Sequence, residues 1–91
     1  MSTLRIEHEL GRDGARERIA GLAKKHSVQL ETADGLQGHL SKTLPFVGRV
    51  RARFAIEERL LEVEILEAPA FPSAETLRRM VEDELKRALT R

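Results

Sequence analysis

The chain has 91 residues, and its 16 basic and 15 acidic residues leave a formal net charge of +1. This length predicts one domain, residues 1–91, and the near-balance of charge argues against a general polyanion-binding surface. Because there is no cysteine, disulfides and thiolate metal sites are excluded. No apolar run approaches the roughly 20 residues of a membrane span, and the polar first residues are unlike a signal peptide, so a cytoplasmic protein is expected.

The first predicted elements are a strand and a helix. Alternation of apolar and charged residues predicts a strand over Thr3–Leu10, and Gly11 ends it. Asp13 is the expected N-cap of a helix that runs to about His26. The positions that recur at helical spacing are Ala15, Ile19, Leu22, Ala23 and His26. We expect this helix to depend on packing against a sheet, since two glycines weaken it.

A second alternation, over residues 28–32, begins a predicted hairpin. The three-residue loop Ala33–Gly35 fits a type I turn closed by a left-handed glycine. This loop length places Leu30 opposite Gly38 and gives the two strands one shared apolar side. Pro45, in the connection that follows, cannot donate to a ladder and marks an interruption or an edge.

The clearest pattern covers residues 48–66, where alternation occurs twice around a charged turn at Glu57–Leu60. A period of two indicates a β-hairpin with one apolar and one charged face. Its apolar residues are Val50, Ala52, Phe54, Ile56, Leu61, Val63 and Ile65. The turn position predicts a register in which Phe54 faces Val63 and Arg53 faces Glu64.

The last predicted element is an amphipathic helix that follows the proline-containing link 67–72. Ser73 is the expected N-cap. The apolar positions are Leu77, Met80, Val81, Leu85, Ala88 and Leu89. The polar face offers the i,i+4 pairs Glu75–Arg79, Glu82–Lys86 and Asp83–Arg87.

These elements predict an α+β fold in the order β-α-β-β-β-β-α. A sheet with one apolar face needs a cover, and two helices are available. We therefore expect a single antiparallel sheet with both helices packed on one face.

Candidate chemistry is sparse, and no catalytic, cofactor-binding or metal-ligating residues are predicted. The three histidines, His8, His26 and His39, lack the short spacing typical of zinc ligands, so structural or surface roles are expected. The serines have no nucleophile-elbow context, and no carboxylate lies in an apolar stretch that would raise its pKa. A non-enzymatic protein is therefore expected.

Two surfaces remain as candidates for interaction. Arg49, Arg51 and Arg53 form a stripe, with Lys42 nearby, that could bind phosphates. Glutamates on the next strand would neutralise it, and the chain has neither Trp nor Tyr to stack bases, so nucleic-acid binding is disfavoured. Met80, on the apolar side of the last helix, belongs to the second surface, which would contact a partner if it were not covering the sheet.

Several segments together resemble a known family. They are Leu4–Arg12, the Ala/Arg/Glu-rich helix that ends in Leu22–Lys25, the Gly48–Val50 step into an alternating strand, and Met80–Leu89. Over nearly its whole length the chain resembles the small bacterial polyhydroxyalkanoic acid system proteins, also called polyhydroxyalkanoate granule-region proteins. The resemblance implies a bacterial cytoplasmic protein linked to polyester storage granules, with no established active site.

The leading hypothesis is thus a non-enzymatic accessory protein that interacts with the granule surface or with granule-associated proteins. One alternative is a nucleic-acid- or ribosome-associated protein that uses the Arg49, Arg51 and Arg53 face. Another is a protein with an apolar pocket for a small hydrophobic ligand between the sheet and the last helix. The small core also makes a homodimer plausible, edge to edge or through the helix.

Overall fold

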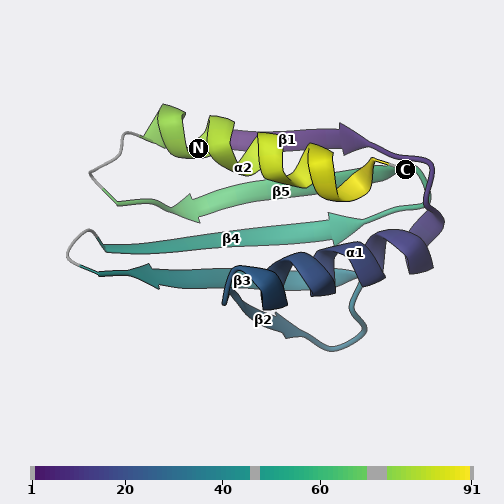
Figure 1. The fold of residues 1–91 in the computed structure, drawn as a ribbon, viewed down its shortest axis with the longest axis horizontal. Helices are drawn as coiled ribbons and strands as arrows, with labels where there is room; N and C mark the ends of the chain where they lie inside the picture. Colours follow the sequence, from purple (N-terminus) through teal and green to yellow (C-terminus); the bar gives the residue numbers. More distant parts are fainter. Residues whose placement is uncertain (1, 46–47, 70–73, 91) are drawn as a thin grey trace.

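The computed structural model describes residues 2–45, 48–69 and 74–90, and these form one antiparallel sheet and two α-helices (Figure 1). The elements are β1 (Ser2–Glu7), α1 (Gly11–Lys25), β2 (Gln29–Thr32), β3 (Gln37–Leu44), β4 (Gly48–Ile56), β5 (Leu60–Glu67) and α2 (Ala74–Leu89). The predicted α+β class and element order are confirmed. The predicted N-cap Ser73 and part of the link 67–72 lie outside the described residues.

The strand order in the sheet is β1-β5-β4-β3-β2, and every neighbouring pair is antiparallel. The N-terminal strand is therefore an edge strand that pairs with the last strand of the chain. Both helices lie on the same face, α2 over β1 and β5, and α1 over β4, β3 and β2 (Figure 1). The other face of the sheet has no helix over it. This layering confirms the expected cover of one face.

The core lies between the helices and the alternate strand residues that point toward them. The largest side chains that are fully buried are Phe54, Leu4, Leu61 and Val63. Burial of each such side chain contributes about 1.5–3 kcal/mol. The helices complete the layer with Ala15, Ile19, Leu85 and Leu89. The β4–β5 register is the predicted one, with Phe54 opposite Val63 and Arg53 opposite Glu64.

The β2–β3 register differs from the prediction by two residues. Leu30 faces Leu40, and Thr32 faces Gly38. Polar groups in the turn hold a longer loop than the predicted one, because Asp34 Oδ1 accepts hydrogen bonds from the N–H groups of Leu36, at 2.9 Å, and Gln37, at 3.2 Å. A two-residue shift preserves the side to which each residue points, so the predicted faces hold although the predicted partners are wrong.

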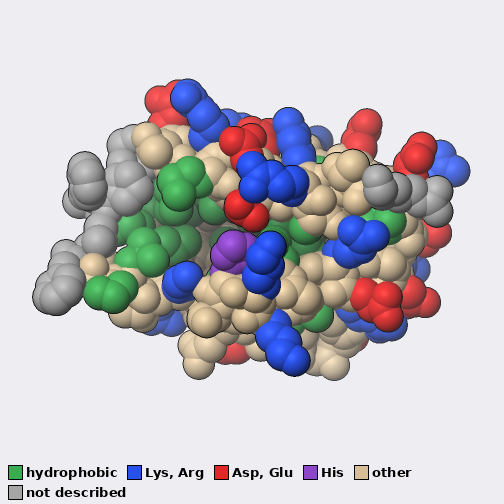
Figure 2. Space-filling model, viewed as in Figure 1, with side chains coloured by type: hydrophobic (Ala, Val, Ile, Leu, Met, Phe, Trp, Pro, Cys, Tyr) green, Lys and Arg blue, Asp and Glu red, His purple; other side chains and the backbone are tan. Residues whose placement is uncertain are grey.

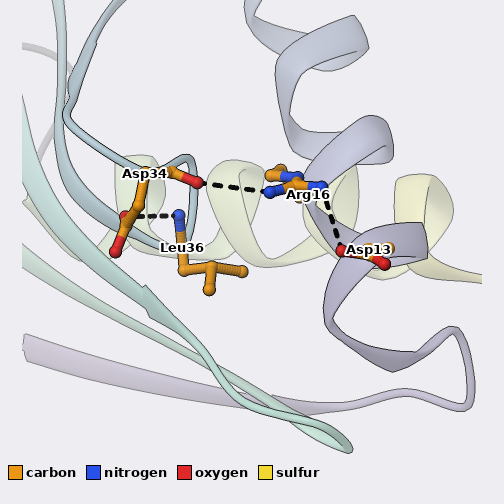
Figure 3. A network of polar contacts seen from close by, with 4 residues as sticks. All are labelled: Asp13, Arg16, Asp34 and Leu36. Carbon is orange, nitrogen blue, oxygen red and sulfur yellow. Dashed lines mark hydrogen bonds and ion pairs between the residues drawn. The ribbon is translucent and has the colours of Figure 1, made fainter.

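A polar network connects this turn to the first turns of α1 (Figure 3). Arg16 donates to the backbone oxygen of Asp34 at 3.4 Å and to Asp13 Oδ1 at 2.9 Å. Asp13 therefore lies inside the helix as the partner of Arg16, and the prediction that it is the N-cap is wrong. The helix begins at Gly11, and Leu10, at the N-cap position, makes no side-chain cap. The Arg16 contacts thus connect the first turns of the helix to the β2–β3 turn.

The carboxylate of Asp34 is expected to make a pH-dependent contribution to stability. The hydrogen bond from Leu36 N–H, followed by that from Gln37, lowers the pKa of Asp34 from its usual value of 3.8. Stabilisation by the carboxylate is therefore complete above that value and is lost as the pH falls through the lower, folded-state pKa. We expect Asp34→Ala to reduce the unfolding free energy more at neutral pH than in acid, as measured by urea denaturation across pH.

Asp34→Asn is the matched control, because it retains the acceptor oxygen without the charge. The difference in unfolding free energy between Asp34→Asn and the wild type should also become smaller in acid. At neutral pH the unfolding free energy of Asp34→Asn should lie between those of the wild type and Asp34→Ala. A difference between the wild type and Asp34→Ala that did not change with pH would contradict the role given to the carboxylate.

Candidate functional site

The arginine stripe lies on the face of the sheet that has no helix over it. Arg53 Nη2 forms an ion pair with Glu64 Oε1, as the register predicted. On the neighbouring strands Arg5 Nε lies 3.5 Å from Glu62 Oε2. These two pairs neutralise the middle of this face. Arg49 and Arg51 are exposed near the start of β4.

Lys42 lies near the stripe, as expected, and lines one hollow together with Arg49, but its side chain belongs to the other side of the sheet. It alternates with Ser41 and Thr43, and therefore shares the helix side of β3 with Leu40 and Leu44. Its Nζ donates to the backbone oxygen of His26, at the end of α1, at 2.7 Å. A cation there interacts favourably with the unpaired carbonyls and the negative end of the helix dipole.

The same contact marks where α1 stops. Ser27 has φ of 55°, the left-handed conformation that commonly ends a helix. Val28 N–H donates to Ala23 O at 2.8 Å and Ser27 N–H to Lys24 O at 3.4 Å, which is the pattern of a Schellman motif. Because of this turn the chain leaves the helix and enters β2. The far ends of β3 and β4 extend beyond the last turn of α1 (Figure 1).

The second helix does not cover the ends of β3 and β4 that extend beyond α1. Leu77, Leu85 and Leu89 are buried beneath α2, but Met80 is 55% exposed and is the large hydrophobic residue that stands out among the described ones. Glu84 Oε2 lies 3.5 Å from His26 Nε2, so this side of α2 faces the end of α1. Met80 precedes Glu84 by one turn on the same side and therefore lies past the end of α1.

One predicted ion pair on α2 also differs. Glu75–Arg79 and Glu82–Lys86 are present, at 3.5 and 3.7 Å. Arg87, however, pairs with Glu84 at 3.1 Å rather than with Asp83. Glu84 thus contacts both Arg87 and His26, and it connects the polar side of α2 to α1.

We call the apolar residues left without a helix cover at this end the open patch, and it consists of Leu44, Val50 and Met80. Leu44 and Val50 are half-buried and lie on the helix side of neighbouring strands, where Val50 faces Lys42 and Leu44 faces Gly48. Figure 2 shows hydrophobic side chains gathered at this end of the molecule, beside the hollow between the two helices. Sequence reasoning named Met80 as a possible interaction residue, which stays a prediction, and it missed Leu44, although the alternation of Leu44 with Lys42 and Leu40 carried the signal.

Near the end of α2 a hollow is lined by Ile6, Leu60 and Leu89 with Lys86, whereas under the middle of α2 the space between sheet and helix is filled. Phe54, Leu77 and Leu85 are buried there, and Val81 packs against the same cluster. The apolar pocket that a small hydrophobic ligand would need beneath α2 is thus occupied by the side chains of the protein itself.

Charge is distributed unevenly along the molecule. Exposed cations lie in two places: Lys24 and Lys25 in the last turn of α1, and Arg49 and Arg51 near the start of β4. Ser27, Lys42 and Arg49 line one hollow at the edge of β3, so the end of α1 and the start of β4 lie close together. We call Lys24, Lys25, Arg49 and Arg51 the basic rim.

The opposite end is rich in carboxylates. The β4–β5 turn carries Glu57 and Glu58, and Glu9 and Asp13 lie at the start of α1. All four are exposed. The same end also carries the exposed Arg12 and Arg59, and Glu67 lies opposite Arg51 at the other end, so charges of both signs occur at both ends.

Among the histidines, His8 has a structural role. His8 is buried, with Nε2 3.1 Å from Glu57 O, and its Nδ1 accepts from Leu10 N–H at 3.3 Å. This side chain fastens the end of β1 to the β4–β5 turn. No three His, Asp or Glu side chains within residues 2–45, 48–69 and 74–90 are arranged to hold a metal ion. Neither described helix is long and apolar enough to cross a bilayer.

Comparisons with family models, with curated proteins and with solved structures found no match to this chain. The resemblance to the granule-region family therefore remains a prediction.

The contact between Lys42 and α1 can be tested by mutation. Lys42→Met keeps the apolar stem and removes the hydrogen bond to His26 O, so we expect it to lower the free energy of unfolding by about 1 kcal/mol in chemical denaturation. Arg49→Gln, a residue away in the ladder but on the exposed face, should change it by less than about 0.5 kcal/mol. Equal effects of the two substitutions would contradict the assignment of Lys42 to the helix side.

Proposed function

We propose that this chain is a non-enzymatic accessory protein that attaches to bacterial polyhydroxyalkanoate storage granules through the open patch. The observation that carries the proposal is the exposure of Met80, 55% on α2, together with Leu44 and Val50, which are only half-buried on the helix side of β3 and β4. A contiguous apolar region on a small protein is typical of a site for contact with another surface. The sequence resemblance directs the choice to the storage granule.

The shape of the site fits attachment to a surface better than it fits enclosure of a molecule. The patch lies at one end of an elongated body, with extents of 36 × 22 × 21 Å, and the strands run along the long axis (Figure 1). Granule-associated proteins in the same cytoplasm would be alternative contacts for it.

The nucleic-acid alternative has less support. Arg53 and Arg5 are ion-paired with glutamates, which leaves Arg49 and Arg51 as the cations of that face. Single-stranded nucleic acid is usually bound by exposed aromatic residues together with a basic groove. The side chain of Phe54 is buried under the helices. Binding that weakened on Arg51→Ala at low salt would favour this alternative.

Co-sedimentation with amorphous poly-3-hydroxybutyrate particles tests the proposal. The wild type should sediment with the particles to a greater extent than an inert protein of the same size. Met80→Gln should weaken binding about fivefold, because burial of the exposed half of a methionine side chain contributes about 1 kcal/mol. Val50→Thr, which exchanges a methyl for a hydroxyl, should act in the same direction.

Glu17→Gln, an exposed change on α1 away from the patch, is the control and should bind like the wild type. Partitioning of the wild type no greater than that of the inert protein would exclude attachment to the polymer. Equal binding of Met80→Gln and Glu17→Gln would exclude the open patch as the site.

A further inference from the structure

The outer edge of β1 carries backbone groups that the sheet does not use. β1 ends the sheet and, among the described strands, pairs with β5 alone (Figure 1). His8 N–H donates to Arg59 O at 3.0 Å, so the backbone groups of His8 point toward β5. Along an antiparallel ladder such residues alternate with residues whose N–H and C=O groups point the other way. The backbone groups of Thr3, Arg5 and Glu7 therefore point outward from the sheet.

The hollow near the end of α2 opens onto this edge. It is lined by Arg5, Ile6 and Glu7 of β1 and by Lys86 and Leu89 of α2. Because consecutive side chains of a strand point to opposite faces, a hollow that touches all three strand residues lies at the edge of the strand. The outward backbone groups of Arg5 and Glu7 are thus accessible from this hollow.

We propose that two copies of this chain associate through this edge, with β1 antiparallel to β1 about a two-fold axis at Ile6, so that the two sheets become one. An unpaired strand edge is a template for another strand, and a two-fold contact closes on itself. None of the open-patch residues lies on β1 or lines the hollow, so the dimer is independent of the proposed function.

Two geometric conditions restrict the register. Residues directly opposite each other in a sheet point to the same face, so the helix side of one copy must continue the helix side of the other. The outward N–H and C=O groups of the two strands must also meet. Both conditions hold when odd-numbered residues of β1 lie opposite odd-numbered residues of the second β1. The two-fold axis then passes through a residue and not between two residues.

Charge selects Ile6 as that residue. With the axis there, Arg5 of each copy lies opposite Glu7 of the other, and symmetry makes this pair occur twice. An axis at Arg5 or at Glu7 would place two like charges directly opposite each other, and an axis at Leu4 would place Arg5 opposite Thr3. Opposite charges across a ladder stabilise the pairing, and like charges destabilise it.

The side chains of this pair are available for it. Glu7 is exposed and forms no ion pair within residues 2–45, 48–69 and 74–90. The side chain of Arg5 is 72% exposed, and its Nε lies 3.5 Å from Glu62 Oε2. In the dimer each Arg5 lies between Glu62 of its own β5 and Glu7 of the second copy. The Ile6 side chains meet on the helix side, beside the hollow.

The other edge of the sheet lacks this complementarity. β2 has four residues, Gln29–Thr32, and Glu31 is its one charged residue. Antiparallel self-pairing of β2 therefore brings no opposite charges together, and one of its registers places Glu31 opposite itself. A contact of β1 on β2 of the next copy would repeat as an open chain unless it closed into a ring. Pairing of β1 with β1 is the contact that the charges favour.

Charge exchange tests the register, with molar mass measured by sedimentation equilibrium over a range of protein concentrations. The mass of the wild type should rise from that of one chain to that of two. Arg5→Glu and Glu7→Arg should each raise the dimer dissociation constant at least tenfold, because each places like charges at both symmetric positions. The double variant Arg5→Glu/Glu7→Arg restores opposite charges and should dimerise within about threefold of the wild type.

Proline substitution tests the use of the backbone. Proline at an outward-pointing position of an edge strand removes an N–H group without loss of a bond to the neighbouring strand. Arg5→Pro should abolish the dimer, whereas Arg5→Gln, which keeps the N–H group, should only weaken it. Thr3→Pro is the matched control and should dimerise like the wild type, because Thr3 lies beyond the end of the second β1 in this register. Circular dichroism should show all these variants folded.

Several results would overturn the proposal. One is a wild type with the mass of a single chain at every concentration. Another is a double charge variant that dimerises as weakly as the two single ones, or equal effects of Arg5→Pro and Thr3→Pro. A dimer that persisted in Arg5→Glu but was lost in Met80→Gln would place the interface on α2 and not on β1.

Discussion

The structure depends on one constraint, which is that the apolar face of a five-stranded sheet must be covered by two helices of 15 and 16 residues. The long strands β4 and β5 hold most of the apolar side chains, and their middle and one end are well covered. Phe54, Leu61 and Val63 are almost completely buried. At the other end the face continues beyond the helices, and the apolar residues there are half-buried or exposed.

The position of that opening follows from how α1 ends. A left-handed Ser27 and the hydrogen bond from Val28 N–H to Ala23 O turn the chain into β2. The Lys42 ammonium then fills the space beyond the last carbonyls. Continuation of the helix would require the loss of this cap, and it would also displace the start of β2. The open patch is thus a consequence of specific contacts that fix the helix end.

The distribution of charge has a similar local origin. Arg53 and Arg5 meet glutamates because their strands lie in antiparallel register beside β5. Arg49 and Arg51 lie beyond that region, where a register shift interrupts the ladder between Arg51 and Ala52. The lysines at the end of α1 suit its helix dipole. Ordinary requirements of strand pairing and helix termination therefore place these four cations, and none of them forms an ion pair within residues 2–45, 48–69 and 74–90.

Alternation with a period of two determined which side of the sheet each residue of β4 and β5 faces, and a short charged turn determined their register. The same pattern could not give the β2–β3 register, because polar contacts of Asp34 across the turn set the loop length. It also could not show that β1 lies beside β5, because strand periodicity contains no information about partners. Only the tertiary structure decided the roles of Lys42 and Met80, since both depend on where a helix distant in sequence stops.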